Sequence, residues 1–196
     1  MKESVKEVEI KIPIANASRA RALLKRTGFR VKKRRVFESN VLYDTAEQTL
    51  RGRREILRVR TVGRDAIVTY KGPPEAGPHK SREEVEYHAG SGELAALVFE
   101  RLGFRPMFRY EKFRTEYVRG REPGEVTLDE TPIGVFLELE GPPAWIDRTA
   151  VRLGFSPSDY VTASYGSLYL DYARARGVEP THMVFTRRRR NSSGNI

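Results

Sequence analysis

The chain has 196 residues, of which 39% are hydrophobic and 32% charged, and its formal net charge is +10. This length favours one domain of ordinary size, and the apolar fraction is enough for a core. The absence of cysteine excludes disulfides and thiolate metal sites, and three histidines are too few for a histidine-rich zinc site. A metal would therefore be a hard ion on carboxylates, Mg²⁺ or Mn²⁺.

The start of the chain alternates charged and apolar residues, unlike a signal peptide, and no apolar run reaches bilayer length. We therefore expect a soluble, cytoplasmic protein with no membrane partner. The basic excess is compatible with nucleic acid, a phosphate-rich small molecule or an anionic surface as partner. Composition does not choose among them.

Periodicity predicts eight strands and four helices. In chain order they are a strand at 6–13; a helix capped by Asn16 or Ser18 and ending at Gly28; strands at 36–44, 56–62, 65–71 and 81–88; a helix from Ser91 or Gly92 to Gly103; strands at 112–119, 125–130 and 134–140; a helix from Pro142 and Pro143 to Gly154; and a helix at 164–176. We expect residues 1–180 to form a single domain and residues 181–196, with arginines at 187–190, a basic disordered tail.

One face of most predicted strands is charged, because residues two apart point to the same side. Glu7, Glu9 and Lys11 share a face, with Val8 and Ile10 opposite. The pattern recurs in Arg58 and Arg60; in Lys80, Arg82, Glu84 and Glu86; in Lys112 and Arg114; and in Glu138 and Glu140, with Lys71 and Asp129 near strand ends.

Two architectures fit these faces. The charged faces could meet water around a sandwich core, which is the common arrangement for half-buried strands. The carboxylates, however, come in close pairs that repel unless a cation lies between them. The amphipathic helices also need an apolar surface to cover. Both features favour an α+β fold in which helices pack outside a closed eight-stranded antiparallel β-barrel with a charged interior.

The same residues occur in motifs that resemble CYTH domains, the triphosphate tunnel metalloenzymes. Glu7-x-Glu9-x-Lys11 is similar to the ExExK signature of that family. The further motifs, in order over about residues 5 to 170, are Tyr43-Asp44-Thr45, Leu57-Arg58-Val59-Arg60, Tyr70-Lys71-Gly72, Arg82-x-Glu84-x-Glu86, Lys112-x-Arg114-x-x-Tyr117, Leu128-Asp129, Glu138-Leu139-Glu140-Gly141 and Ser164-Tyr165-x-x-Leu168. The resemblance implies an eight-stranded tunnel, a divalent metal and a triphosphate substrate.

The resemblance also implies roles for individual residues. On the metal side stand Glu7, Glu9, Asp129, Glu138 and Glu140, while Glu84 and Glu86 bind metal or hold basic partners. The phosphate contacts would be Lys11, Arg58, Arg60, Lys71, Arg82, Lys112 and Arg114. Because a lysine among arginines can have a lowered pKa, Lys11 and Lys71 are the catalytic candidates for activating the attacking group.

Three functions are compatible with these residues. We favour metal-dependent hydrolysis of an inorganic or organic triphosphate, because it requires less of the site than cyclisation does. The alternative is a class IV adenylyl cyclase, which converts ATP to cyclic AMP and pyrophosphate. From another class comes a non-catalytic binder of polyphosphate or of RNA 5′-triphosphate, which would gain nothing from so many carboxylates. Since much of the positive charge would lie inside the tunnel, we expect no nucleic-acid partner; a homodimer is left open.

Overall fold

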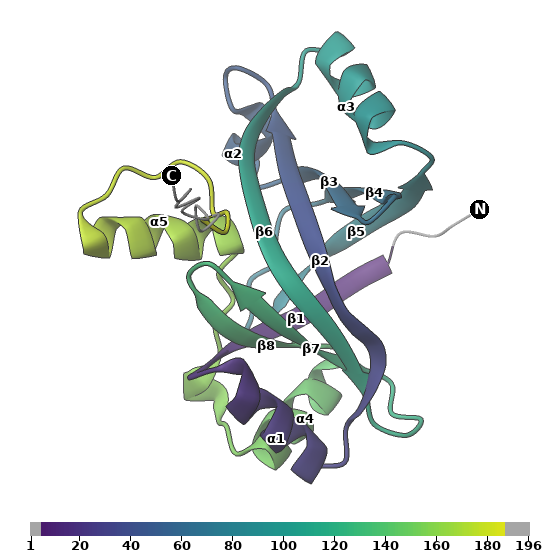
Figure 1. Cartoon of the computed structure of the whole chain (residues 1–196), viewed down its shortest axis with the longest axis vertical. Coiled ribbons are helices and arrows are strands. Elements are labelled where there is room, and N and C mark those ends of the chain that lie inside the picture. The colour runs from purple at the N-terminus through teal and green to yellow at the C-terminus, as the bar shows by residue number, and fades with distance from the viewer. Residues whose placement is uncertain (1–4, 187–196) are drawn as a thin grey trace, which may run out of the picture.

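The computed structural model describes residues 5–186, and its strands close into an antiparallel barrel in the order β1-β5-β4-β3-β2-β6-β7-β8 (Figure 1). The strands are β1 (Val5–Ile14), β2 (Arg30–Asp44), β3 (Ile56–Val62), β4 (Asp65–Lys71), β5 (Lys80–Ala89), β6 (Arg105–Val118), β7 (Glu125–Thr131) and β8 (Gly134–Glu140). Because β1 pairs with both β5 and β8, the sheet closes on itself. The predicted closed eight-stranded barrel is confirmed.

The helices pack outside this barrel, as predicted. They are α1 (Ala17–Arg26), α2 (Thr49–Gly52), α3 (Gly92–Arg101), α4 (Pro143–Leu153) and α5 (Tyr165–Arg176), with a short 3₁₀ turn at Pro157–Asp159. Asn16, Ser91 and Ser164 each accept a hydrogen bond from a backbone N–H of the first turn, as N-cap residues do. Figure 1 shows α1 and α4 together at one end, α3 at the other and α5 at the side.

The apolar faces of the strands form the core beneath the helices. Ile10 and Leu137 lie in one buried cluster with Leu24 of α1 and Ile146 of α4. A second, smaller cluster joins Val59 and its neighbours on β2 and β4 to α3. Since the helices cover the outer faces, the charged faces turn into the barrel, and the alternative of a sandwich with charged faces in water is wrong.

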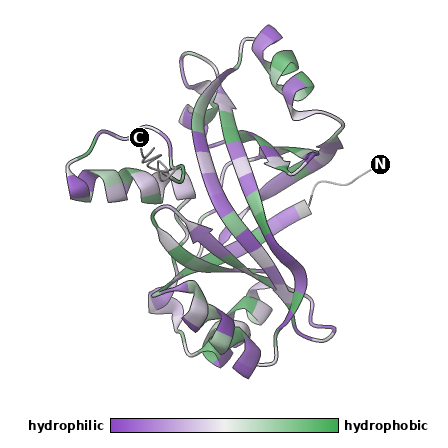
Figure 2. Cartoon of the chain, in the orientation of Figure 1, coloured by the Kyte–Doolittle hydropathy of each residue, from purple (hydrophilic) through white to green (hydrophobic). Residues whose placement is uncertain are grey.

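Strands β2 and β6 start earlier than the sequence predicts, at Arg30 and Arg105 instead of 36 and 112. The first residues of both strands are almost all exposed, so neither carries the alternation that marks a half-buried strand. Pro106 is tolerated because it stands next to the strand's first residue. Figure 2 shows the alternating hydropathy further along both strands.

The helix α2, which the sequence analysis missed, is anchored to the end of β2 by Asp44. The Asp44 carboxylate accepts hydrogen bonds from the backbone N–H groups of Thr45 at 2.8 Å, Leu50 at 2.9 Å and Arg51 at 2.9 Å. A carboxylate at a helix start compensates backbone donors that have no partner within the helix. These bonds fix the segment from α2 to β3 at one opening of the barrel.

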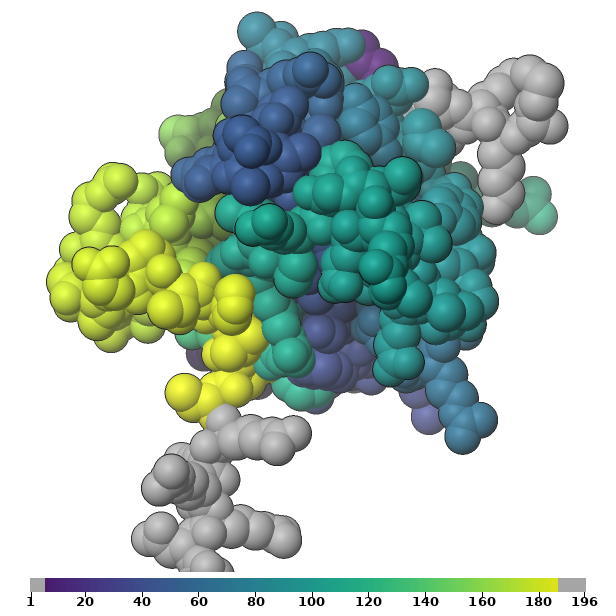
Figure 3. All heavy atoms as spheres, turned by 90° about the horizontal axis from the view of Figure 1, so that it is seen from above, coloured from purple at the N-terminus to yellow at the C-terminus, as the bar shows by residue number. Residues whose placement is uncertain are grey.

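The residues after α5 return to the barrel. Met183 is fully buried, its N–H donates to the Arg109 carbonyl at 3.0 Å, and its own carbonyl accepts from the Glu111 N–H at 2.9 Å. Figure 3 shows α5 and the segment after it, yellow-green to yellow, projecting from one side of the molecule. The arginines at 187–190 of the predicted tail lie outside the described residues. No helix within residues 5–186 has the length and apolarity that crossing a membrane would require.

Candidate functional site

The charged strand faces meet inside the barrel, where most of the predicted site residues are buried. Exposed fractions of 0 to 9% are found for Glu7, Glu9, Lys11, Arg58, Lys71, Arg82, Lys112, Arg114, Asp129 and Glu138. Arg60, Glu84 and Glu140 are half-buried, and the Glu86 side chain is 39% exposed. Because buried charges need partners, the ion pairs among these side chains describe how the interior is balanced.

One group of ion pairs joins β1 to β4 and β5. The Lys71 ammonium donates to both carboxylate oxygens of Glu7 at 2.6 Å and lies 3.2 Å from Glu84. Lys80, the first residue of β5, donates to the Glu9 carboxylate. Lys80 therefore stands on the strand and faces the interior, one residue before the predicted strand start at 81.

A second group joins β1 to β6, β7 and β8. The Lys11 ammonium lies 3.0 Å from Glu9 and 3.2 Å from Glu138. The Arg114 guanidinium donates to both oxygens of Asp129, at 2.7 and 2.6 Å, and also to Glu138. This fork-on-carboxylate geometry is the strongest kind of charge-assisted hydrogen bond in proteins. Glu138 thus joins Lys11 of β1 to Arg114 of β6.

Asp129 is the most completely engaged carboxylate of the interior. Besides Arg114, it accepts hydrogen bonds from the Lys112 ammonium at 2.7 Å and from the Tyr165 hydroxyl at 2.8 Å. Asp129 has no exposed surface, and Tyr165, the first residue of α5, is 6% exposed. The Tyr165 ring also lies under the ammonium groups of Lys11 and Lys112, with their nitrogens 5.3 and 5.2 Å from its centroid. Tyr165 therefore holds α5 against the charged interior.

The β2–β3 side of the interior contains residues that the sequence analysis did not assign. Arg58 donates to Thr69 at 2.9 Å and to Glu86 at 3.1 Å. Glu38, only 1% exposed, lies 3.7 Å from Arg60 and 3.8 Å from Lys112. Glu38 stands within a correctly predicted strand, on the same face as Asn40 and Leu42. Because its neighbours on that face are uncharged, the sequence did not indicate a charged face, and Glu38 was missed.

The pKa values of the interior carboxylates move in opposite directions. Burial opposes ionisation of Glu9 and Glu138, but Lys11 and the other nearby cations more than offset it, so both pKa values lie well below the usual range. Burial raises the pKa of Glu140 to about 7, and the nearby Glu7 and Glu9 carboxylates add to the rise. Burial likewise raises the pKa of Glu84 to about 7, although Lys71 opposes it.

The lysines are also unequal. Burial opposes the charge of Lys11, but Glu9 and Glu138 more than offset it, and the pKa of Lys11 is raised. Burial lowers the pKa of Lys80; Glu9 opposes this effect, and Lys11 and Lys71 add to it. The lysine with a lowered pKa is therefore Lys80, and the pKa of Lys11 moves away from the value that suits a base.

The carboxylates of the interior suggest a site for a divalent metal. Within residues 5–186, no three carboxylate or imidazole groups converge closely enough to hold an ion as the side chains stand. The interior carboxylates pair with basic side chains, except for Glu140, for which the described residues supply no ion-pair partner. Glu140 on β8 is the register partner of Glu9 on β1. A cation near Glu7, Glu9 and Glu140 would relieve this excess of negative charge, so these residues fit a hard divalent ion.

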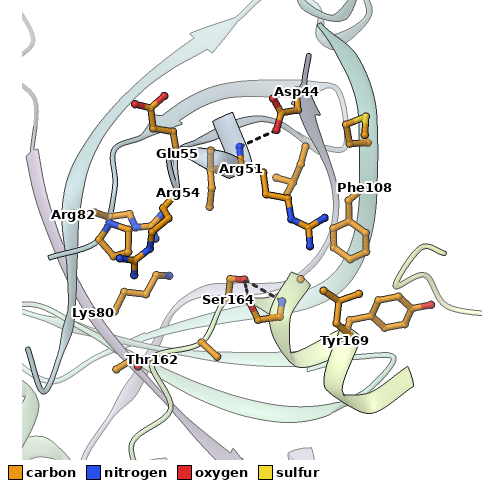
Figure 4. A pocket seen from close by; sticks show the side chains of 18 of the residues that line it. Asp44, Arg51, Arg54, Glu55, Lys80, Arg82, Phe108, Thr162, Ser164 and Tyr169 are labelled. Carbon is orange, nitrogen blue, oxygen red and sulfur yellow. Dashed lines mark hydrogen bonds between the residues drawn. The ribbon is translucent and has the colours of Figure 1, made fainter. Parts of the chain in front are cut away.

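A cavity of about 870 Å³ opens at the end of the barrel where α2 and α5 lie (Figure 4). Lys80, Arg82 and Arg54 line one side, and Phe108 and Tyr169 lie opposite them. Two nitrogens of the Arg82 guanidinium, Nε and Nη1, are buried and have no hydrogen-bond partner within residues 5–186. Buried charged donors without a partner are rare, and an anion in the cavity would satisfy them.

Comparisons with known proteins agree with this geometry. The family model described as CYTH domain matches residues 5–148. A Methanocaldococcus jannaschii protein named "Putative adenylate cyclase" is 33% identical over 135 residues, which cover 68% of this chain and 75% of that protein.

Solved structures of other proteins also resemble the barrel. One, of a Vibrio parahaemolyticus protein named "putative adenylate cyclase", has a TM-score of 0.73 at 21% identity and covers 85% of this chain and 98% of that one. Another, from Hippeastrum, is named "Putative adenylyl cyclase HpAC1" and is said to reveal a dominant triphosphatase activity. It has a TM-score of 0.63 at 16% identity, covering 91% of this chain and 98% of that one. At these identities the likeness shows the fold alone.

Proposed function

Because this chain belongs to the CYTH domain family, we propose that it is a metal-dependent enzyme that hydrolyses a small molecule carrying a triphosphate. The family implies a triphosphate substrate and a divalent metal. The observation that carries the proposal is the barrel interior, where buried lysines and arginines from five strands face one another with their counter-charges. Phosphoryl transfer needs such charge neutralisation and positioning more than it needs a covalent catalyst.

The basic residues would hold the phosphates. In this proposal the contacts come from Lys11, Arg58, Arg60, Lys71, Arg82, Lys112 and Arg114. Arg82 and Arg58 already have buried donors without a partner among residues 5–186, whereas the other side chains would exchange part of their carboxylate contacts for phosphate oxygens. The raised pKa of Lys11 keeps it charged, which suits a donor to phosphate better than a base. Lys71 stays the proposed residue for proton transfer.

The carboxylates would divide between metal and basic side chains. Glu7, Glu9 and Glu140 are proposed to hold Mg²⁺ or Mn²⁺, with Glu138 nearby, because Glu140 adds a carboxylate beside Glu7 and Glu9 for which the described residues supply no basic partner. Such an ion supplies neutralisation of phosphate charge and polarisation of a phosphorus–oxygen bond. Both oxygens of Asp129 are taken, so its proposed task is to orient Lys112 and Arg114. Glu84 and Glu86 would orient Lys71 and Arg58 in the same way.

Cyclisation of ATP is the second candidate, and two observations favour it. The relatives from Methanocaldococcus jannaschii and Vibrio parahaemolyticus carry adenylate cyclase in their names. The cavity at the barrel end also has an aromatic side, formed by Phe108 and Tyr169, which a planar base could contact. Hydrolysis is favoured because it requires no placement of a ribose hydroxyl, and the Hippeastrum protein of the same fold is described with a dominant triphosphatase activity.

Product analysis separates these reactions. The protein is incubated with Mg²⁺ or Mn²⁺ and, separately, tripolyphosphate, ATP and thiamine triphosphate. Orthophosphate from a triphosphate supports hydrolysis, and cyclic AMP with pyrophosphate from ATP supports the cyclase. If none of the three substrates reacts with either metal, the proposal of an enzyme is wrong.

Two variants with matched controls test the site. Arg58→Ala and Glu9→Gln should each lower kcat/KM at least a hundredfold, since both side chains lie in the buried interior. Arg64→Ala and Glu47→Gln make the same chemical changes at exposed positions and should leave turnover unchanged. Equal activity of the interior variants and their controls would contradict the site.

A further inference from the structure

Arg54, between α2 and β3, has a backbone conformation that is unusual for its residue type. Its φ is +62°, and within residues 5–186 the only other residue besides glycine with positive φ is Gln48, at +57°. The left-handed region is disfavoured for residues with a Cβ, and glycine adopts it without that penalty. Such strain persists where the surrounding structure enforces it, often at ligand sites. An arginine in this position raises the question of what its side chain does.

The Arg54 side chain lines the cavity at the barrel end and lies next to Arg82, with Lys80 close by (Figure 4). Within the described part of the chain, neither guanidinium forms a hydrogen bond or ion pair with a carboxylate. Glu55 also lines the cavity but points away from the two arginines in Figure 4. Two guanidinium groups thus lie side by side with no carboxylate of the described residues in direct contact with either, and like charges in this arrangement repel.

The side chain of Arg82 gives a second observation that points to a ligand, separate from the backbone conformation of Arg54. Arg82 is 5% exposed, and its Nε and Nη1 atoms are buried without a hydrogen-bond partner among the residues that the structure describes. Burial lowers the pKa of Arg82; Glu7 and Glu9 oppose that effect and Arg54 adds to it. An anion that accepted hydrogen bonds from both guanidinium groups would satisfy the orphaned donors and remove the repulsion.

The cavity shares two residues of β5, Lys80 and Arg82, with the charged interior, and Lys80 donates a hydrogen bond to Glu9 there. In the β1–β5 register, Arg82 lies opposite Glu7 and Lys80 lies opposite Glu9. A chain of phosphates held in the interior would therefore reach Arg82 first and Arg54 next on its way out. The guanidinium fork matches the spacing of phosphate oxygens, whereas a lysine offers a point charge.

We propose that Arg54 and Arg82 form a clamp for the outermost phosphate of the substrate, and that Arg54 thereby sets the affinity for triphosphates. This inference rests on the proposed function and adds Arg54, a residue of the α2–β3 turn, to the binding site. The ligand class is a linear phosphate chain that extends from the barrel interior to its opening. Pyrophosphate, being shorter, would leave Arg54 without a contact when bound in the interior.

Arg54→Gly is the sharpest test, because affinity and stability should change in opposite senses. Glycine suits φ +62°, so the melting temperature should rise or stay unchanged. The KM for tripolyphosphate should rise about tenfold with kcat little changed, as expected for loss of a charge-assisted contact. Arg54→Lys keeps the charge but not the fork and should give an intermediate KM. If Arg54 had only a structural role, a rise in KM would be accompanied by a lower melting temperature.

Arg53→Ala is the matched control for charge. Arg53 is adjacent and exposed but does not line the cavity, so its replacement removes the same charge from the same turn. Its KM for tripolyphosphate should equal that of the wild type. If Arg53→Ala and Arg54→Gly raise KM equally, the effect is one of long-range charge and the clamp is wrong.

Calorimetric titration of the metal-free protein with tripolyphosphate and with pyrophosphate separates failure of the clamp from failure of the proposed function. Arg54→Gly should weaken tripolyphosphate binding about tenfold and leave pyrophosphate binding unchanged. If the wild type binds or turns over tripolyphosphate but Arg54→Gly matches it, only the clamp is overturned. If the wild type neither binds nor turns over any triphosphate, the clamp and the proposed function are both overturned.

Discussion

Glu140 of β8 is the register partner of Glu9 of β1, so two carboxylates face the interior from adjacent strands. Glu9 contacts Lys11 and Lys80, whereas the described residues offer Glu140 no ion pair. The two side chains consequently differ in acidity: the pKa of Glu9 is well below the usual range, and burial with the Glu7 and Glu9 charges raises that of Glu140 to about 7. Several measurable properties should depend on this difference.

The metal-free protein should lose stability as pH rises from about 5 to 8, because the buried Glu140 carboxyl ionises over this range. Its folded pKa of about 7 lies above that of an unfolded glutamate, so its protonated form stabilises the folded state, and this contribution disappears as pH rises through 7. Glu140→Gln removes the effect. The advantage of the variant over the wild type should therefore grow between pH 5 and 8 by at most about 3 kcal/mol, or several degrees in melting temperature.

Thermal melting in the presence of a chelator measures this difference. Glu84, whose pKa burial also raises to about 7, remains in both proteins and cancels in the comparison. Glu47→Gln, at an exposed position, is the control and should keep a constant offset from the wild type. A constant offset for Glu140→Gln would show that Glu140 is ionised in the folded protein throughout this range.

Metal affinity should also depend on the ionisation of Glu140. It should increase with pH, whereas the stability of the metal-free protein decreases. A carboxylate must lose its proton to bind a cation, so Mn²⁺ affinity should increase as pH rises from 6 to 8. Calorimetry in two buffers of different ionisation enthalpy should detect proton release on binding. Glu140→Gln should weaken Mn²⁺ binding about tenfold and abolish most of the proton release. Unchanged affinity in this variant would remove Glu140 from the metal site.

Much of the interior could be predicted because the sequence alternates wherever a strand has one buried apolar face. The outer face of β1, with Ile10, packs under helices, and its inner face carries Glu9 and Lys11. Where β2 and β6 begin, almost every side chain is exposed, and the alternation that would reveal a strand is missing. Prediction therefore fails for the first residues of these two strands, where neither face is buried.

Residues whose position depends on tertiary contacts could not be predicted in the same way. The helix α2 has four residues and depends on the Asp44 carboxylate at the end of a strand, so no periodic pattern marks it. Arg54 follows that helix and appears in the sequence as one arginine in a basic turn. Its backbone conformation and its place beside Arg82 became evident only with the fold.

Tyr165 should contribute to stability through its hydroxyl. Tyr165→Phe deletes the 2.8 Å hydrogen bond to the buried Asp129 carboxylate, and its expected destabilisation is about 1.5–3 kcal/mol, as for hydrogen bonds to charged groups. Tyr172→Phe, on the same helix and without a hydroxyl bond among the described residues, should change stability by less than about 0.5 kcal/mol. Urea unfolding measures both. Equal stability of the two variants would mean that Asp129 is satisfied by Lys112 and Arg114 alone.

Phe108 offers a test of whether the substrate carries an aromatic base. Phe108 lines the cavity opposite Arg54 and Arg82, and its ring contacts Tyr169 with centroids 5.7 Å apart. Phe108→Leu keeps the apolar volume but removes the aromatic face. Because base–aromatic stacking contributes about 1–3 kcal/mol per base, the KM for ATP should rise at least fivefold. The KM for tripolyphosphate, which has no base, should stay unchanged and serves as the internal control. A parallel rise for both substrates would place Phe108 in support of the phosphate site, and no change for either would leave the aromatic side of the cavity without a role in binding ATP.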